Sequence, residues 1–520
     1  MASITVRVTG SFDERPGAMS RELPLPAQVR VAVIGSGFAG LGAAIRLKQA
    51  GYDDLVVLER ADDLGGTWRD NTYPGCACDV PSHLYSFSFA PNPDWSSTFS
   101  PQPEIHAYLR RVAEQEGLEP HLRFGCEVEE ATWDEPAQRW RLRTSAGRLT
   151  ARAVVAAAGP LSEPAIPDIP GLRDFQGTVF HSATWDHDHD LDGERVAVIG
   201  TGASAIQFVP QIQPRVGKLH LFQRTAPWIM PRPDRPLTRF ERALYRRVPA
   251  AQRLMRKAIY WGREAYAIPL LRVRLSRVIE RLARRHLRRQ VADPELRAKL
   301  TPDYAPGCKR ILVSNDYLPA LGRPNVEVVC DGIAEIRERS IVAKDGTERE
   351  LDTIILGTGF HVTDLPIAEK ICGRDGRTLA QVWDDGMVTN RSAAVAGFPN
   401  MFLLVGPNVG VGHTSMVYMI ESQVAYVESA LGAMEAENLE VIETTPQAQD
   451  AYRELIAKRS EGTVWLAGGC ASWYLDKHGH NTTLWPDFTF RFRQLTKKLD
   501  RENYVGTPAG EPQRETEVAA

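Results

Sequence analysis

The sequence predicts an α/β fold built from two similar strand–turn–helix–strand units, with a helical insertion in the second unit. Two observations predict it. An apolar strand followed by a glycine-rich turn and a helix of small residues occurs near residue 31 and again near residue 195. At 520 residues the chain is also long for one folding unit, and its hydrophobic fraction of 43% can build full cores.

The first unit reads VRVAVIGSGFAGLGAAIRLKQAGYDDLVVLER from residue 29. Its strand at residues 31–34 leads into Gly35, Gly37 and Gly40, and its second strand ends at Glu59. The first glycine permits the turn, the second lets backbone N–H groups approach a pyrophosphate, and the third lets helix and strand pack closely. Because a carboxylate such as that of Glu59 accepts hydrogen bonds from ribose hydroxyls, we expect a dinucleotide without a 2′-phosphate.

The second unit repeats the pattern with Gly200, Gly202 and Ala205. At the end of its second strand, Arg224 and Thr225 stand where the first unit has its acid. A guanidinium and a hydroxyl can bind a 2′-phosphate, whereas a carboxylate would repel it. The second nucleotide is therefore predicted to be NADPH rather than NADH; the alternative is an unrelated surface arginine at a strand end.

Two dinucleotide sites in one chain indicate a flavoprotein that takes hydride from a nicotinamide. Apolar strands at residues 151–160 and 351–360 bracket the second unit, so we expect two Rossmann-like domains, the first of them discontinuous. The predicted order is an N-terminal arm (1–28), the first part of the FAD-binding domain (29–160), the NADPH-binding domain (161–355) with a helical insertion at about 235–299, the second part of the FAD-binding domain (356–504) with a mobile loop at about 468–486, and a disordered tail (505–520).

The arginine-rich insertion has apolar residues at helical spacing, as in RVRLSRVIERLARRHLRRQV from residue 272. It is either a solvated helical cover of the site or a surface that touches an anionic membrane. The net charge of −3 gives the whole molecule no attraction to nucleic acid. No apolar run of membrane-spanning or signal-peptide length occurs, so we expect a cytoplasmic protein, either a monomer or a homodimer.

The seven cysteines are scattered and odd in number, which favours free thiols in a reducing cytosol over a disulfide framework. Only Cys76 and Cys78 are close together, and no second Cys or His pair at zinc spacing accompanies them. No metal is therefore expected. A redox-active pair, as in a disulfide reductase, remains an alternative for these two cysteines.

The segment FQGTVFHSATWD, residues 175–186, shows neither a helix face nor strand alternation. It matches the fingerprint FxGxxxHxxxW[PD] of type I Baeyer–Villiger monooxygenases at Phe175, Gly177, His181, Trp185 and Asp186. A second family signature is matched by GGTWRDNTYPGCACD, residues 65–79. The chain resembles this family over most of its length. The resemblance implies that the fingerprint lies between the FAD and NADPH domains, where it couples domain position to flavin reduction; alternatively its side chains are only structural.

The resemblance implies a ketone substrate, O2, FAD and NADPH, with esters or lactones formed through a C4a-peroxyflavin and a tetrahedral adduct. Such a peroxide must stay anionic, and a fixed cation beside it would stabilise it. The segment PGCKRILVSNDYLPAL is similar to the family segment in which the lysine, here Lys309, contacts the NADPH phosphate and the arginine, here Arg310, stands over the flavin. Asp79 is implied to pair with Arg310. The alternatives are a flavin-containing monooxygenase that oxidises amines or sulfides, and an NADPH oxidase.

Motif positions and the resemblance together give two sets of predicted cofactor contacts. The predicted FAD-binding residues are Gly35, Gly37, Phe38, Ala39, Gly40, Glu59, Thr67, Trp68, Asp79, Tyr85, Val128 and Met416. The predicted NADP-binding residues are Gly200, Thr201, Gly202, Ala203, Ser204, Ala205, Gln207, Arg224, Thr225, Lys309, Arg310 and Trp473. One departure from the family pattern is Gly357, where alanine is more usual; we expect it to reduce local rigidity without changing function.

Overall fold

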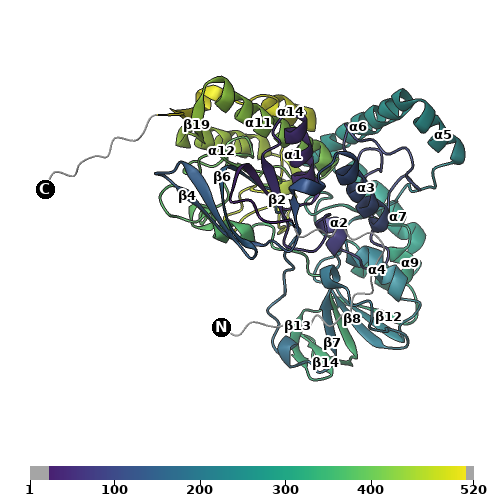
Figure 1. Cartoon of the computed structure of the whole chain (residues 1–520). Helices are drawn as coiled ribbons and strands as arrows, with labels where there is room; N and C mark the ends of the chain where they lie inside the picture. Colours follow the sequence, from purple (N-terminus) through teal and green to yellow (C-terminus); the bar gives the residue numbers. More distant parts are fainter. Residues whose placement is uncertain (1–22, 511–520) are drawn as a thin grey trace.

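The computed structural model of the protein describes residues 23–510, which form two α/β units and a projecting group of helices (Figure 1). The predicted α/β fold is confirmed. Residues 1–22 of the predicted N-terminal arm and residues 511–520 of the predicted tail lie outside the described residues.

The larger sheet of the described chain has eight strands in the order β17-β4-β5-β6-β1-β2-β3, with β18 beside β6. They are β1 (Gln28–Ile34), β2 (Leu55–Leu58), β3 (Leu122–Arg123), β4 (Val128–Asp134), β5 (Arg139–Thr144), β6 (Gly147–Ala156), β17 (Ile371–Cys372) and β18 (Met401–Leu403). At the centre β1 is parallel to β2 and β6, so Val33 lies opposite Val57 and Val155. The sheet combines two separate stretches of sequence.

The second sheet of the described chain has five parallel strands in the order β12-β9-β8-β16-β7. They are β7 (Thr178–His181), β8 (Arg195–Ile199), β9 (Lys218–Phe222), β12 (Val326–Val329) and β16 (Thr353–Leu356). Residues 178–181 form a strand, although the segment 175–186 shows no strand alternation. Because β7 is a short edge strand, pairing with β16 holds it without a regular alternation of apolar side chains.

Helices cover these sheets and form the insertion. The helices outside the insertion are α1 (Phe38–Gln49), α2 (Thr67–Asp70), α3 (Gln102–Gln115), α4 (Ala205–Ile212), α9 (Tyr317–Leu321), α10 (Leu379–Val382), α11 (Met416–Ala436), α12 (Pro446–Ser460), α13 (Val464–Ala467) and α14 (Thr489–Thr496). The insertion contains α5 (Arg239–Arg247), α6 (Pro249–Leu271), α7 (Arg277–Gln290) and α8 (Pro294–Lys299). In Figure 1, α5 and α6 project from the body of the molecule.

Three small sheets complete the structure that is described. They are β10 (Ile229–Met230) with β11 (Leu312–Val313), β13 (Ile333–Arg337) with β14 (Ser340–Ala343) and β15 (Glu348–Glu350), and β19 (Leu439–Thr444) with β20 (Tyr504–Pro508). The prediction that residues 505–520 are disordered is therefore wrong for residues 505–508. Residues 504–508 pair antiparallel with β19, and the Tyr504 hydroxyl lies 2.8 Å from that of Tyr426.

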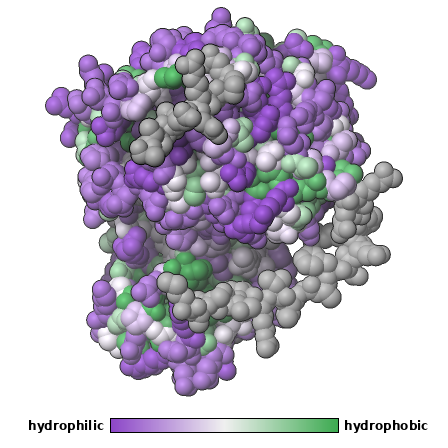
Figure 2. All heavy atoms as spheres, turned by 60° about the vertical axis from the view of Figure 1, so that its left-hand side comes forward, coloured by the Kyte–Doolittle hydropathy of each residue, from purple (hydrophilic) through white to green (hydrophobic). Residues whose placement is uncertain are grey.

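The central strands of both sheets are buried on both faces, as parallel strands between helices should be. The face shown in Figure 2 is mostly hydrophilic, with hydrophobic residues in small patches. Within residues 23–510, no helix combines the length and apolar character needed to cross a membrane.

Gly357, the departure from the family pattern, has room for a methyl group. An added Cβ would lie 3.5 Å from the Cβ of Ala205 and 3.5 Å from the carbonyl oxygen of Ile199, which is ordinary contact. Gly200 differs, because its φ is +113° and a Cβ there would overlap the carbonyl of Gly357. We expect Gly357→Ala to stabilise the fold by about 0.4–1 kcal/mol, because alanine lowers the conformational entropy of the unfolded chain.

Thermal unfolding monitored by circular dichroism tests this expectation, with Gly200→Ala as the contrasting variant. Gly357→Ala should hold or raise Tm, and Gly200→Ala should lower it. A Tm for Gly357→Ala below that of the parent protein would contradict the packing described here.

Candidate functional site

One cavity gathers most of the residues that the sequence predicts to bind FAD. It lies where the glycine-rich turn after β1, helix α2 and the start of α11 meet. The predicted residues that line it are Gly35, Gly37, Phe38, Ala39, Glu59, Thr67, Trp68, Tyr85, Val128 and Met416, together with Arg310 and Trp473. Gly40 and Asp79 are not part of the lining. The fold thus brings together segments that are far apart in the sequence.

The first glycine-rich turn leaves room for a pyrophosphate beside its backbone. Gly35 has a φ of +99°, and a Cβ there would lie 2.8 Å from the carbonyl oxygen of Ala157. On Gly37 the nearest atom to an added Cβ would be the Gly66 Cα at 3.8 Å, which is ordinary contact, so the backbone is not crowded there. A Cβ on Gly40 would overlap the Gly35 carbonyl, because helix and turn pack closely there. The turn therefore fits a dinucleotide.

The second glycine-rich turn has the same construction. Gly200 packs against the carbonyl of Gly357, while a Cβ on Gly202 would meet no described heavy atom within 4 Å. The Thr201 hydroxyl donates a hydrogen bond to the carbonyl oxygen of Thr225 at 3.1 Å, which joins the turn to the end of β9. Ala203, Ser204 and Ala205 continue the turn into α4. This turn also fits a dinucleotide.

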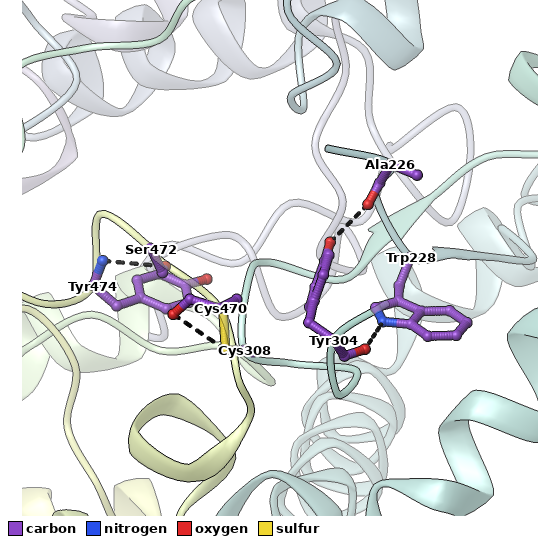
Figure 3. Close-up of a disulfide and its surroundings, with 7 residues drawn as sticks. All are labelled: Ala226, Trp228, Tyr304, Cys308, Cys470, Ser472 and Tyr474. Carbon is purple, nitrogen blue, oxygen red and sulfur yellow. Dashed lines mark hydrogen bonds between the residues drawn. A yellow bond between two sulfur atoms is a disulfide. The ribbon is translucent and has the colours of Figure 1, made fainter. Parts of the chain in front are cut away.

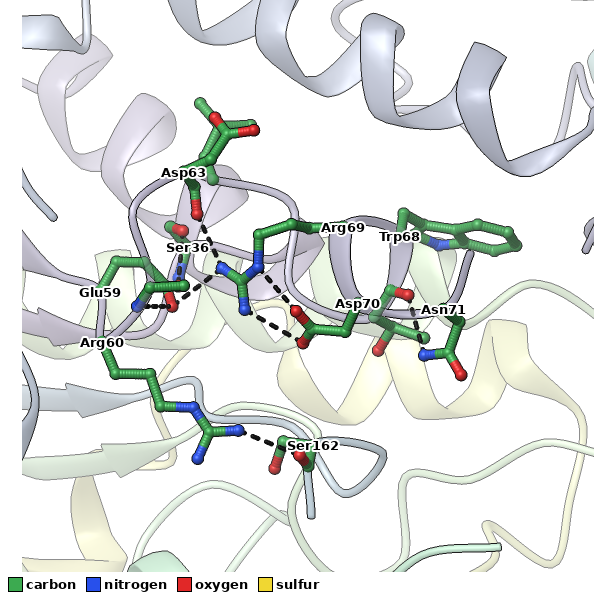
Figure 4. A network of polar contacts seen from close by, with 12 residues as sticks. Ser36, Glu59, Arg60, Asp63, Trp68, Arg69, Asp70, Asn71 and Ser162 are labelled. Carbon is green, nitrogen blue, oxygen red and sulfur yellow. Dashed lines mark hydrogen bonds and ion pairs between the residues drawn. The ribbon is translucent and has the colours of Figure 1, made fainter. Parts of the chain in front are cut away.

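Glu59 is held at the cavity edge by a network of polar contacts (Figure 4). Ser36 donates from its backbone N–H at 3.0 Å and from its hydroxyl at 2.6 Å to one carboxylate oxygen. The other oxygen accepts the Ala61 N–H at 3.0 Å and pairs with Arg69 at 2.9 Å. The network fixes the carboxylate, and its contact with ribose hydroxyls stays a prediction. Sequence reasoning missed Arg69, which carries no motif signal of its own.

Asp79 and Arg310 form an ion pair between residues 231 positions apart. The Arg310 Nε donates at 3.0 Å to Oδ2, and Nη2 donates at 2.9 Å to Oδ1 and at 2.6 Å to Oδ2. Burial alone would raise the pKa of Asp79, but the charge of Arg310, its hydrogen bonds and the charge of Arg263 together outweigh burial, and the pKa is lowered. The Asp79 charge in turn raises the pKa of Arg310. Both groups therefore stay ionised at neutral pH.

Two residues beside this pair were missed by sequence reasoning. Tyr474 is 1% exposed, lines the cavity and lies 4.4 Å ring to ring from Trp473, which is 47% exposed. Burial raises the pKa of Tyr474 to about 12, so its hydroxyl is neutral. Arg263 of α6 is close enough to interact electrostatically with Asp79 and Arg310, and burial lowers its pKa. Tyr474 is adjacent to a predicted residue, whereas nothing in the insertion sequence indicates Arg263.

The expectation of free thiols is wrong for one pair, because Cys308 and Cys470 form a disulfide (Figure 3). The two residues are 162 positions apart, so spacing gives no sign of the bond. Cys308 directly precedes Lys309 and Arg310, and Cys470 lies in the predicted loop three residues before Trp473. The disulfide therefore ties the loop to the segment that carries Arg310.

Cys76 and Cys78 are buried and free. Burial raises the pKa of the Cys76 thiol to about 12 and that of Cys78 further. Since the thiolate is the reactive form, these cysteines are unsuited to disulfide exchange at neutral pH. Among residues 23–510, no group of three or more His, Cys, Asp and Glu side chains could hold a metal ion.

Arg224 and Lys309 form a basic pair at the end of β9. Burial lowers the pKa of Lys309, and the nearby charge of Arg224 lowers it further. The Lys309 Nζ also lies 5.3 Å from the ring centre of Tyr304. In the described part of the chain neither cation has an acidic partner within ion-pair distance. An anion bound between them would relieve their repulsion.

Gln207 of α4 joins the second unit to the signature loop of the first. Its amide accepts hydrogen bonds from the Ala77 N–H at 3.2 Å and the Tyr73 hydroxyl at 3.1 Å, and donates to the Ala77 carbonyl at 2.9 Å. Its predicted contact with NADP would have to compete with these three bonds. Ala77 precedes Asp79 by two positions. By binding Ala77, Gln207 therefore also supports the loop that carries Asp79.

The fingerprint residues occupy a tightly packed joint beside β16. His181 is 3% exposed and accepts the Ala183 N–H at its Nδ1 at 3.1 Å; burial lowers its pKa to about 4, so the ring is neutral. A Cβ on Gly177 would overlap the Phe175 ring and the Asp352 carbonyl. The Trp185 ring lies 5.2 Å from that of Phe208, and Asp186 accepts the N–H groups of the turn that follows. The coupling role of the fingerprint stays a prediction.

Comparisons with known proteins agree on one group of relatives. A family model described as pyridine nucleotide-disulphide oxidoreductase matches residues 32–238. A Baeyer-Villiger monooxygenase of Streptomyces coelicolor is 54% identical over 479 residues, which cover 92% of this chain and 92% of that protein.

Two solved structures are similar over nearly the whole chain. An oxidised steroid monooxygenase bound to NADP is 32% identical, with a TM-score of 0.81, and covers 92% of this chain and 100% of that one. The OTEMO complex with FAD and NADP is 26% identical, with a TM-score of 0.82, and covers 92% of this chain and 99% of that one.

The disulfide should contribute measurably to stability because it closes a long loop, with a typical contribution of about 2–4 kcal/mol. Dithiothreitol should therefore lower the Tm of the parent protein and leave that of Cys308→Ser/Cys470→Ser unchanged. The matched control is Cys330→Ser, which removes an exposed free thiol and should respond to dithiothreitol like the parent protein. A parent Tm that does not respond to the reductant, with no disulfide-linked peptide in mass spectrometry, would contradict the bond.

Proposed function

Because the chain belongs to the Baeyer–Villiger monooxygenase family and is an NADPH-dependent flavin monooxygenase, we propose that it inserts one oxygen atom of O2 beside a ketone carbonyl. The products are an ester or lactone, NADP+ and water, with NADPH and a proton supplying the reducing equivalents. The observation that carries this proposal is the ionised Asp79–Arg310 pair, whose arginine lines the cavity assigned to FAD.

The cofactors are FAD and NADPH, and the residues present fit both. We assign FAD to the cavity behind the first glycine-rich turn and the NADPH 2′-phosphate to Arg224, Thr225 and Lys309. The support is the uncrowded backbone at Gly37 for FAD, and for NADPH the two cations that have no acidic partner within ion-pair distance among the described residues. When bound, FAD supplies the hydride acceptance and the oxygen activation that no side chain provides.

Arg310 is assigned to stabilise negative charge at the reacting oxygen atoms. Its Nε and Nη2 are committed to Asp79, whereas its Nη1 has no hydrogen-bond partner among the described residues. The pair therefore fixes the plane of the guanidinium and leaves one nitrogen free to donate toward the cavity. A preorganised donor of this kind stabilises developing charge without reorganising during the reaction.

The flanking residues support this arrangement. Tyr474 presents a neutral phenol close to Arg310, which suits it to donate a hydrogen bond to an oxygen atom of the substrate. Trp473, on the disulfide-tied loop, also lines the cavity. We assign it to cover bound NADP and to keep water from the reacting atoms.

Arg310→Ala should retain FAD and still oxidise NADPH, but it should form no ester, because the free donor and its charge are lost. We expect ester formation to fall by about two to three orders of magnitude, the scale for loss of one preorganised donor. Arg310→Lys should fail as well, since an ammonium cannot reproduce the guanidinium's fixed geometry. Product analysis by gas chromatography, with hydrogen peroxide assayed in parallel, checks this.

Asp79→Asn should show a weaker version of the same defect, because Arg310 keeps its charge but loses the charged partner that fixes it. If Arg310→Ala makes ester at close to the parent rate, the assignment is wrong. Thioether oxidation by the same variant would then show whether the protein is a sulfide oxidase instead.

Arg224→Ala should raise the KM for NADPH by about one to two orders of magnitude, the equivalent of one charge-assisted contact of roughly 1.5–3 kcal/mol. The KM for NADH should stay unchanged, since NADH has no 2′-phosphate. Steady-state kinetics with both nucleotides tests this, and Arg323→Ala, which removes an exposed arginine just before β12, serves as the matched control. An unaltered preference for NADPH in Arg224→Ala would refute the phosphate assignment.

A further inference from the structure

The outward face of α6 exposes an apolar stripe. Leu254, Trp261 and Ile268 are spaced by seven residues and are 69%, 58% and 45% exposed. Side chains seven positions apart on a helix share one face. Ala258 and Ala265 lie between them and are exposed as well. The stripe is therefore a continuous apolar line along most of the helix.

The start of α7 also exposes apolar side chains. Val278 and Leu282 are 57% and 50% exposed, and Leu275 just before the helix is exposed too. We call the exposed apolar residues of α6 and α7 together the outer helical face. Nine of the fourteen large hydrophobic residues that are exposed in the described structure lie between residues 240 and 282. Exposed apolar side chains are thus concentrated in the insertion.

The side of α6 next to this stripe is firmly anchored. Glu264 is 2% exposed; it pairs with His413 at 3.2 Å and accepts the Thr489 N–H at 3.0 Å. Tyr260 stacks on Tyr418 with ring centres 4.6 Å apart. These contacts hold the helix against the body of the molecule. The outer stripe is therefore exposed although the helix is well packed.

The insertion carries an extreme charge. Residues 239–289 contain sixteen lysine and arginine residues and three acids, in a chain whose total net charge is −3. The exposed Arg253 and Lys257 lie on α6, and Arg277, Arg281 and Arg285 follow one another along α7. A surface that combines an apolar stripe with flanking cations has the chemistry of an interfacial amphipathic helix.

We propose that the outer helical face docks on an anionic lipid bilayer. Trp261 suits the interface between headgroups and acyl chains, and long arginine side chains reach the lipid phosphates from a partly inserted helix. A second copy of the chain would bring two strongly basic surfaces together, and nucleic acid would leave the apolar stripe exposed to water. The bilayer is the partner that satisfies both features at once.

Docking would place the lipid close to the cavity, because only the width of helix α6 separates its outer face from the residues of the site. On the inner face, Arg263 interacts with Asp79, and Leu270 packs against Gly307, two residues before Lys309. A ketone dissolved in the bilayer would therefore have a short route to the cavity. This last step rests on the proposed function, whereas docking itself does not.

Co-sedimentation of the FAD-loaded protein with vesicles tests docking. We expect binding to vesicles of phosphatidylcholine and phosphatidylglycerol that is at least about tenfold tighter than to phosphatidylcholine alone and is weakened by salt. Leu254→Glu/Trp261→Glu and, separately, Arg253→Glu/Lys257→Glu should each reduce it. The matched control is Ile166→Glu/Val505→Glu, two exposed apolar residues outside the insertion, which should bind like the parent protein.

Retained FAD and unchanged turnover of a water-soluble ketone show that each variant is folded, and they report on the proposed function separately from docking. Equal sedimentation with both vesicle types, or parent-like binding by both insertion variants, would overturn the proposal. So would a dimer that Leu254→Glu/Trp261→Glu converts to a monomer in analytical ultracentrifugation, because the stripe would then be a subunit interface.

Discussion

The ion pair between Asp79 and Arg310 is the interaction around which the site is organised. A charge at the wall of a cavity is stable only when it is matched in geometry, and here two guanidinium nitrogens of Arg310 donate to both carboxylate oxygens of Asp79. Removal of either partner would leave an uncompensated charge, which is far more costly than the net contribution of the pair. Because Asp79 and Arg310 belong to different units, the pair also fixes how the two units meet.

The surrounding structure holds each half of this pair in place. On one side, Gln207 reaches from α4 to the backbone of Ala77, two residues before Asp79. On the other side, the bond between Cys308 and Cys470 fixes the segment that leads into Arg310. The restraints come from three distant stretches of the chain. They explain how a loop-borne arginine can have the fixed geometry that charge stabilisation requires.

The two nucleotide units share the same arrangement of glycines in the turn but differ in the residues that would contact the nucleotide. At both turns the first glycine packs against a neighbouring carbonyl, and a Cβ on the second would meet no atom closer than 3.8 Å. The units diverge where the second strand ends: Glu59 lies in a network that includes Arg69, while Arg224 lies near Lys309 without an acidic partner in the described chain. One site is thus arranged as an acceptor of hydrogen bonds and the other as an anion site. The same backbone scaffold thus suits two different adenine dinucleotides, of which only NADPH carries a 2′-phosphate.

The sequence by itself determined the two nucleotide units, the insertion and the residues around the cavity, because glycine spacing, strand length and helical periodicity are local properties of the chain. Apart from the Asp79–Arg310 pair, which the family resemblance implied, it missed contacts that depend on packing between distant segments. The disulfide joins positions 162 residues apart, β20 forms only because β19 offers an edge, and Tyr474 and Arg263 meet the ion pair through the folding of a loop and an inserted helix. Local conformation is set by neighbours along the chain, whereas these contacts are set by which surfaces the whole fold brings together.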